Sequence, residues 1–233
     1  MNDYSMRRPF FVLLLVAFAA LGLNAQDNQY NSAKDSDPEA VKLLSDVRTK
    51  YDAFTSMKAK FQLDIALPGQ PVEKQAGVIS RQGDNVRFVI GDQEGIINEE
   101  AAYIIMHRNK EVQINDLPDP EETTGVLTPQ TLFNFYEGDQ YVLALQGTEK
   151  VGARNLKIIE LKPLDRDNSE FTKLRLLVDA SKKELAMVKA FSRDGSNFTF
   201  TLEETMGNVN LPANTFVFSK TDFPGYHVED LRF

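Results

Sequence analysis

Few residues in this chain of 233 could perform enzyme chemistry, because it has two histidines and no cysteine. The absence of cysteine excludes thiol nucleophiles, disulfides and thiolate-bound zinc. His107 stands beside an expected turn and His227 near the C-terminus, and neither has a serine or carboxylate at the spacing of a catalytic triad. We therefore interpret both histidines as surface or packing residues and not as general bases.

The acidic residues give no stronger sign of catalysis. Neighbouring acids such as Glu99 and Glu100 point to opposite sides of an extended backbone, so a solvated role is favoured over paired acid–base chemistry. Asp165 and Asp167 stand in a short loop that lacks the remaining ligands of a calcium loop. No glycine-rich loop suited to a phosphate occurs either. We expect no catalytic residue, metal or cofactor, and predict that the chain is not an enzyme.

The composition describes an ordinary globular protein and disfavours anionic partners. Hydrophobic residues make up 42% of the chain, and 34 acidic against 26 basic residues leave a net charge of −8. No run of basic residues interrupts this acidic balance. We therefore expect no nucleic-acid partner and little attraction to an anionic membrane surface.

The N-terminus is typical of a secretory signal. Arg7 and Arg8 precede an apolar run over 10–23, and the small residue Ala25 stands before polar sequence. The run is shorter than the roughly 20 residues that a membrane span needs, although an uncleaved anchor is the alternative. We predict a cleavable signal peptide over 1–25, a flexible leader over 26–37, a single domain over 38–233 and a periplasmic location.

The rest of the chain predicts two helices and many strands. Asp37, Pro38 and Glu39 supply an N-cap, a first-turn proline and an acidic first turn for an amphipathic helix that reaches residue 54. A second helix is expected between Thr128 and Gly138. Alternating apolar residues and turn signals predict about ten or eleven strands, at 57–67, 73–81, 86–90, 95–97, 103–107, 111–114, 141–145, 155–161, 171–178, 185–191 and 196–203, with a closing stretch over 216–219 and 224–228.

Nearly every expected strand has one apolar face, and two helices cannot cover so many strands laid flat. The fold class is therefore mainly β, a strongly curved antiparallel sheet that forms an incomplete barrel, with an apolar interior lidded by short helices. Such an interior could hold an apolar ligand, or its side chains could simply fill it as a core.

The order of these segments resembles the periplasmic outer-membrane lipoprotein carrier family, LolA. The resemblance covers essentially all of 38–233 as a diffuse pattern of apolar spacing and turns. The segments that carry it are 51–54 (YDAF), 57–61 (MKAKF), 77–79 (GVI), 103–106 (YIIM), 127–129 (LTP), 132–133 (LF), 151–152 (VG), 158–163 (IIELKP), 171–179 (FTKLRLLVD), 216–218 (FVF) and 224–225 (PG).

The resemblance implies a monomeric periplasmic chaperone that binds lipoprotein acyl chains in its cavity. It would take them from an inner-membrane ABC transporter and pass them to an outer-membrane acceptor. A basic residue after the second strand contacts the lid in this family; here Arg81 or Arg87 could take that role. The side chains that we assign to the cavity are Phe61, Leu63, Ile65, Phe88, Ile90, Ile104, Met106, Leu132, Phe133, Phe135, Tyr136, Leu176, Met187, Phe198 and Phe200.

Three other functions stay open at this point. A periplasmic module that senses lipids or mislocalised lipoproteins would use a similar binding face. A secreted hydrolase that works through carboxylates belongs to a different class, and mutation of acids near the mouth would test it. An inert adaptor domain would release no lipid on extraction.

Overall fold

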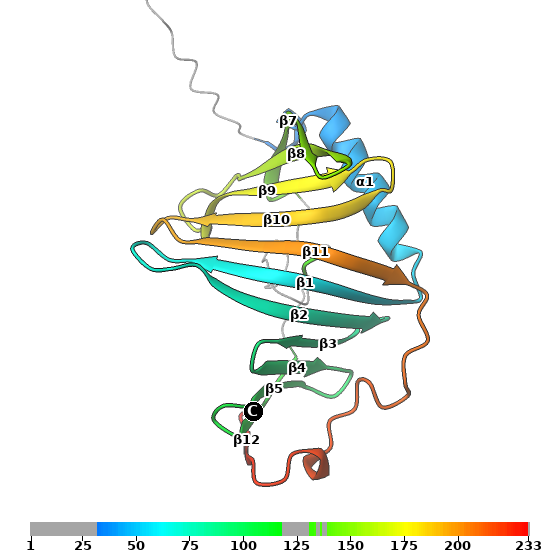
Figure 1. Cartoon of the computed structure of the whole chain (residues 1–233), viewed down its shortest axis with the longest axis vertical. Coiled ribbons are helices and arrows are strands. Elements are labelled where there is room, and N and C mark those ends of the chain that lie inside the picture. Colours follow the sequence, from blue (N-terminus) through cyan, green and yellow to red (C-terminus); the bar gives the residue numbers. More distant parts are fainter. Residues whose placement is uncertain (1–31, 118–130, 134–135, 137–138, 233) are drawn as a thin grey trace, which may run out of the picture.

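The computed structural model describes residues 32–117, 131–133, 136 and 139–232. In this part of the chain twelve strands form one sheet, in the order β12-β6-β5-β4-β3-β2-β1-β11-β10-β9-β8-β7 (Figure 1). The strands are β1 (Ser56–Ala66), β2 (Glu73–Gln82), β3 (Asn85–Ile90), β4 (Gln93–Ile97), β5 (Ala102–Met106), β6 (Glu111–Asn115), β7 (Tyr141–Val151), β8 (Arg154–Pro163), β9 (Phe171–Asp179), β10 (Glu184–Ser192), β11 (Asn197–Gly207) and β12 (His227–Asp230).

The expected fold class is confirmed, with some corrections at the C-terminus. All neighbouring strands pair antiparallel except β12, which pairs parallel with β6. The closing stretch contributes one strand at His227–Asp230, whereas 216–219 is not a strand and precedes the short helix η2 (Lys220–Asp222). The expected helix over 128–138 lies largely outside the described residues.

Helix α1 (Pro38–Asp52) begins where its cap predicts. The Asp37 carboxylate accepts a hydrogen bond from the Glu39 amide at 2.8 Å, and Pro38 occupies the first turn. The helix buries Leu44, Val47 and Tyr51 against the sheet. Ordered structure starts earlier than Asp37, because the helix η1 (Ala33–Asp35) precedes α1 and the amide of Asp37 donates to the carbonyl of Leu143 on β7.

One face of the sheet, which we call the inner face, carries α1 and the largest apolar cluster. The cluster joins α1 to side chains from β1 to β5 and from β7 to β11. Two phenylalanine rings lie flat across neighbouring strands: a Cβ on Gly77 would collide with the ring of Phe61, and a Cβ on Gly95 with that of Phe88. Glycine at these positions therefore lets large rings cover the inner face without pushing the strands apart.

The opposite, outer face carries two smaller apolar clusters. The C-terminal segment crosses β4 to β6 and places Phe218, Phe223 and Tyr226 against Ile96 and Tyr103. In Figure 1 this segment, in red, runs from the end of β11 to β12 at the far end of the sheet from α1. Leu156, Leu177 and Met187 are members of the second cluster, on β8 to β10.

A charged group stabilises the outer face of the same strands. The side chain of Glu160 is 10% exposed and accepts hydrogen bonds from Arg175 (2.5 Å) and Lys173 (3.0 Å). The nitrogens of Lys173 and Lys189 lie 4.9 and 5.0 Å from the centre of the Phe191 ring. Burial opposes ionisation of Glu160, but the bonds from Arg175 and Lys173 outweigh it and lower its pKa below the usual 4.5.

Glu160→Gln should reduce the free energy of unfolding by about 2 kcal/mol at pH 7, because Arg175 and Lys173 lose their anionic acceptor and can donate only to a neutral amide oxygen. A carboxylate whose pKa is lowered by folding stabilises the protein above its unfolded pKa, and this stabilisation disappears as the pH falls through the folded pKa. Urea unfolding from pH 7 to pH 3 should show the two proteins converging at the acidic end. The exposed Glu149 on β7 provides the control, Glu149→Gln. A loss in Glu160→Gln that does not depend on pH would contradict this account.

Candidate functional site

The inner face divides into a filled part and a more open part. Toward β7 to β10, Leu132, Phe133 and Tyr136 are buried together with α1, and the rings of Tyr51 and Phe133 meet edge to face at 5.0 Å. Toward the C-terminal ends of β1 and β3, on β5 and at the start of β11, some inner-face apolar side chains are only half-buried, although Phe61, Leu63 and Val86 on β1 and β3 are buried. The second part presents apolar surface that the described residues do not bury completely.

The structure places the predicted cavity residues in two groups on the inner face. Those that are fully buried are Phe61, Leu63, Leu132, Phe133, Tyr136, Leu176 and Phe200. Those that are half-buried are Ile65, Phe88, Ile90, Ile104, Met106 and Phe198. Ile104 and Met106 are placed on this face by alternation along β5 from Ala102, which belongs to the inner cluster.

Met187 and Phe135 are not among the residues that the structure places on the inner face. The assignment of Met187 to the interior was wrong, because this side chain packs with Ile158 and Leu177 on the outer face. The strand pairing shifts between Leu185 and Met187, so the alternation changes phase there. Phe135 lies outside the described residues.

A cavity of about 540 Å³ lies between α1, η1 and β7. Its apolar wall includes Val41, Leu44, Leu143 and Leu164. Its polar lining consists of Ser32, Lys34, Ser36, Ser45, Arg48, Asp139 and the two tyrosines Tyr136 and Tyr141. Of the predicted cavity residues, only Tyr136 contributes to it. Sequence reasoning missed the rest because the cavity depends on how the first turns of α1 lie against the edge strand β7.

The two arginines that we considered for a lid contact lie on opposite faces. Arg81 Nη2 donates to the carbonyl of Tyr51, in the last turn of α1, at 2.9 Å. Arg87 donates instead to the carbonyl of Thr215 at 3.0 Å and pairs with Glu94 on the outer face. A lid role for Arg87 is therefore wrong, and Arg81 is the arginine that joins the inner face to a helix.

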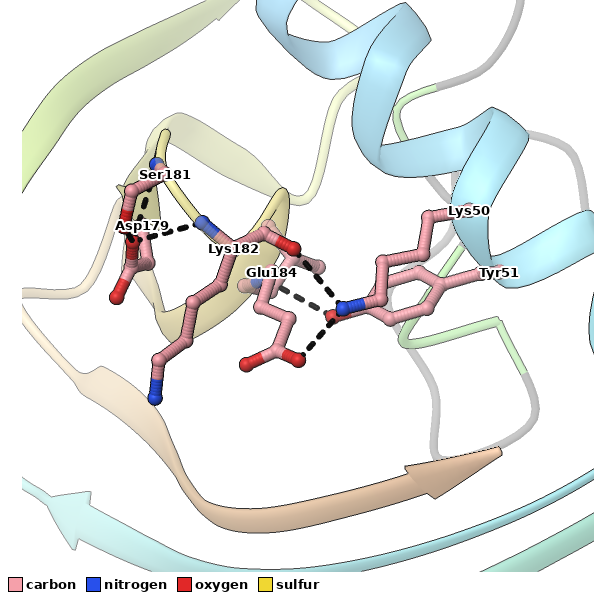
Figure 2. Close-up of polar contacts among 7 residues, drawn as sticks. Lys50, Tyr51, Asp179, Ser181, Lys182 and Glu184 are labelled. Atoms are coloured by element: carbon pink, nitrogen blue, oxygen red, sulfur yellow. Dashed lines mark hydrogen bonds and ion pairs between the residues drawn. The ribbon is translucent and has the colours of Figure 1, made fainter. Parts of the chain in front are cut away.

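The C-terminal half of α1 is also attached to the turn between β9 and β10 (Figure 2). Lys50 Nζ donates to the carbonyl of Lys182 at 2.9 Å and to the Glu184 carboxylate at 2.7 Å. The hydroxyl of Tyr51 accepts a hydrogen bond from the Leu185 amide at 2.9 Å, and burial raises the pKa of this tyrosine. These contacts hold one end of α1 firmly on the sheet. The cavity lies along the side of α1 that carries Val41, Leu44, Ser45 and Arg48.

The histidines take structural positions on the outer side. His107 Nδ1 lies 2.9 Å from the hydroxyl of Tyr226, and its Nε2 lies 3.4 Å from the buried carboxylate of Glu94. His227 begins β12. Within the described residues no group of histidines and carboxylates is arranged to hold a metal ion.

Comparison with known proteins identifies the fold. No protein-family model and no curated protein sequence matches the chain. An uncharacterized conserved protein from Thermus thermophilus aligns with a TM-score of 0.54 at 10% identity, over 82% of this chain and 99% of that one. This similarity shows a shared fold.

Two further solved structures align less closely. The lipoprotein LppX from Mycobacterium tuberculosis gives a TM-score of 0.47 at 11% identity, over 76% of this chain and 100% of that one. A LolA superfamily protein from Nitrosomonas europaea gives 0.41 at 14% identity, over 77% and 97%. The described helices include none that is long and apolar enough to cross a membrane.

Replacing Arg81 with methionine should loosen the last turn of α1. A cation that donates to the terminal carbonyls of a helix contributes about 1 kcal/mol, so amide hydrogen exchange over 49–54 should become about fivefold faster. Arg87→Met is the matched control and should instead affect the C-terminal segment around Thr215. Mass-spectrometric exchange on both variants tests this, and equal effects of the two changes on α1 would contradict a specific contact by Arg81.

Proposed function

We propose that the protein is a periplasmic carrier that binds the acyl chains of lipoproteins on its inner face and moves them from the inner to the outer membrane. The observation that carries this proposal is the group of half-buried apolar side chains on that face, which includes Ile65, Phe88, Ile90 and Phe198. They stand beside a fully buried core, so the domain has a stable part and a part with apolar surface to offer a ligand.

The energetics of acyl chains favour such a divided face. Burying a methylene group lowers the free energy by about 0.8 kcal/mol. Transfer of a 16-carbon chain from an apolar environment to water therefore costs about 12 kcal/mol of free energy. A carrier must supply enough apolar surface to compensate for that loss. Incomplete packing keeps the site from holding the chain too tightly, which allows an acceptor with better contacts to remove it.

The route of transfer follows from the resemblance to the LolA family and from the signal-like N-terminus. An inner-membrane ABC transporter would load the carrier and an outer-membrane acceptor would unload it. Such a role needs binding and release but no covalent step. The position of His107 supports binding over catalysis, since its ring contacts Glu94 and Tyr226 on the outer face, away from the apolar surface.

Ile90→Glu should abolish lipoprotein binding while the protein stays folded. Ile90 is half-buried on the inner face, so a carboxylate there would have to lose its hydration when an acyl chain binds. We expect at least a tenfold fall in the lipoprotein that co-purifies from the periplasm, measured by mass spectrometry. Leu63→Glu is less suitable, because Leu63 is only 8% exposed and its replacement would also destabilise the core.

Val89→Glu provides the matched control. Val89 is the preceding residue on the same strand, points to the outer face and is 37% exposed, so the same charge should leave binding unchanged. Equal co-purification of lipoprotein with both variants would refute the inner face as the binding site. Circular dichroism would confirm that each variant is folded.

A further inference from the structure

The cavity between α1 and β7 combines an apolar wall with a cationic rim. Leu44 and Tyr141 are buried at its base, and Leu143 continues the wall along β7. Lys34 and Arg48 are exposed at its edge. This is the arrangement that an amphiphile requires, because its hydrocarbon part must leave water while its headgroup stays near charge and solvent.

We propose that this cavity binds a single-chain amphiphile with an anionic headgroup, such as a fatty acid. Its chain would lie against Leu44, Leu143 and Leu164, and its carboxylate would lie between Lys34 and Arg48. The inference rests on the proposed function, in which the protein binds acyl chains, and adds the class of headgroup. It also places the ligand at a site separate from the half-buried side chains of β1, β3 and β5.

The size of the cavity suits one chain. If a methylene group occupies about as much space as a water molecule in the liquid, ~30 Å³, then chains of 12 and 16 carbons need about 360 and 480 Å³. The cavity holds about 540 Å³. Small-molecule sites commonly measure about 300–1,000 Å³. A lipid with three chains would not fit here, whereas a free fatty acid or one chain of a larger lipid would.

The charges at the rim select the headgroup. Among the described residues no carboxylate forms an ion pair with Lys34. Arg48 has Asp52 among its partners, at 3.2 Å, and because both of these side chains are about half exposed, this pair contributes little stability. Asp139 is the one carboxylate among the described residues that lines the cavity, and Lys34 is the rim cation that no described carboxylate pairs with. The hydroxyls of Ser32 and Ser45 offer further donors to a carboxylate.

The test compares laurate with 1-dodecanol, which share a 12-carbon chain and differ in charge. Calorimetric titration of the delipidated full chain should show that it binds both ligands. The double variant Lys34→Gln/Arg48→Gln should bind laurate at least tenfold more weakly and dodecanol within twofold of the unmodified protein. Lys42→Gln/Lys183→Gln removes the same number of charges outside the cavity and should change neither affinity.

A second variant tests the location. Ser45 is exposed on α1 and lines the cavity. The larger ring in Ser45→Phe should therefore occupy part of the cavity and lower the affinity for both laurate and dodecanol at least tenfold. The inference is wrong if the unmodified protein does not bind laurate, if Lys34→Gln/Arg48→Gln binds laurate normally, or if Ser45→Phe changes nothing. Lipoprotein co-purification with Ile90→Glu is measured independently, so the carrier proposal can fail or survive separately from this one.

Discussion

The structure depends on one constraint, an apolar sheet face that is much wider than the helix packed against it. In the part of the chain that the structure describes, twelve strands share a continuous sheet, and α1, which packs on its inner face, has fifteen residues. Polar contacts from Lys50 and Tyr51 hold the helix at the β9–β10 turn, and Arg81 joins its last turn to β2. The helix therefore covers one part of the inner face closely. Farther along the sheet, toward β3 and β5, the described residues leave apolar side chains such as Phe88 and Ile104 half-buried.

Different segments of the chain cover the two edges of the sheet. At one edge β12 adds a short parallel strand to β6, and the C-terminal segment covers the outer face with Phe218, Phe223 and Tyr226. At the other edge η1 and the start of α1 lie beside β7, joined by the bond from Asp37 to Leu143. Protection of both edges limits pairing with other chains. At the second edge this protection is loose enough to leave a cavity.

The sequence allowed the strands and the fold class to be predicted, because alternation of apolar residues is a local signal. It could not show where the alternation changes phase. Met187 was assigned to the interior, but the pairing irregularity between Leu185 and Met187 places it on the outer face, whereas Leu185 belongs to the inner cluster. Parallel pairing of β12 was also beyond prediction, since 112 and 228 are brought together only by the path of the whole chain. Arg81 and Arg87 could not be told apart by composition; their strand positions decide which face each one reaches.

The distribution of positive charge on the outer face also depends on strand pairing. No basic run is present in the sequence, and we inferred little attraction to anionic surfaces. Strand pairing nevertheless brings Lys173, Arg175 and Lys189 together on the outer face of β9 and β10. These cations already interact with the Glu160 carboxylate or the Phe191 ring, so they stabilise the sheet and are less available to an external anion. The rim of the cavity differs, because the ammonium of Lys34 has no carboxylate partner among the described residues. An ammonium group at such a position keeps its attraction for an anion that arrives from solution, which is why the headgroup site is placed beside Lys34 and not on the outer face of β9 and β10.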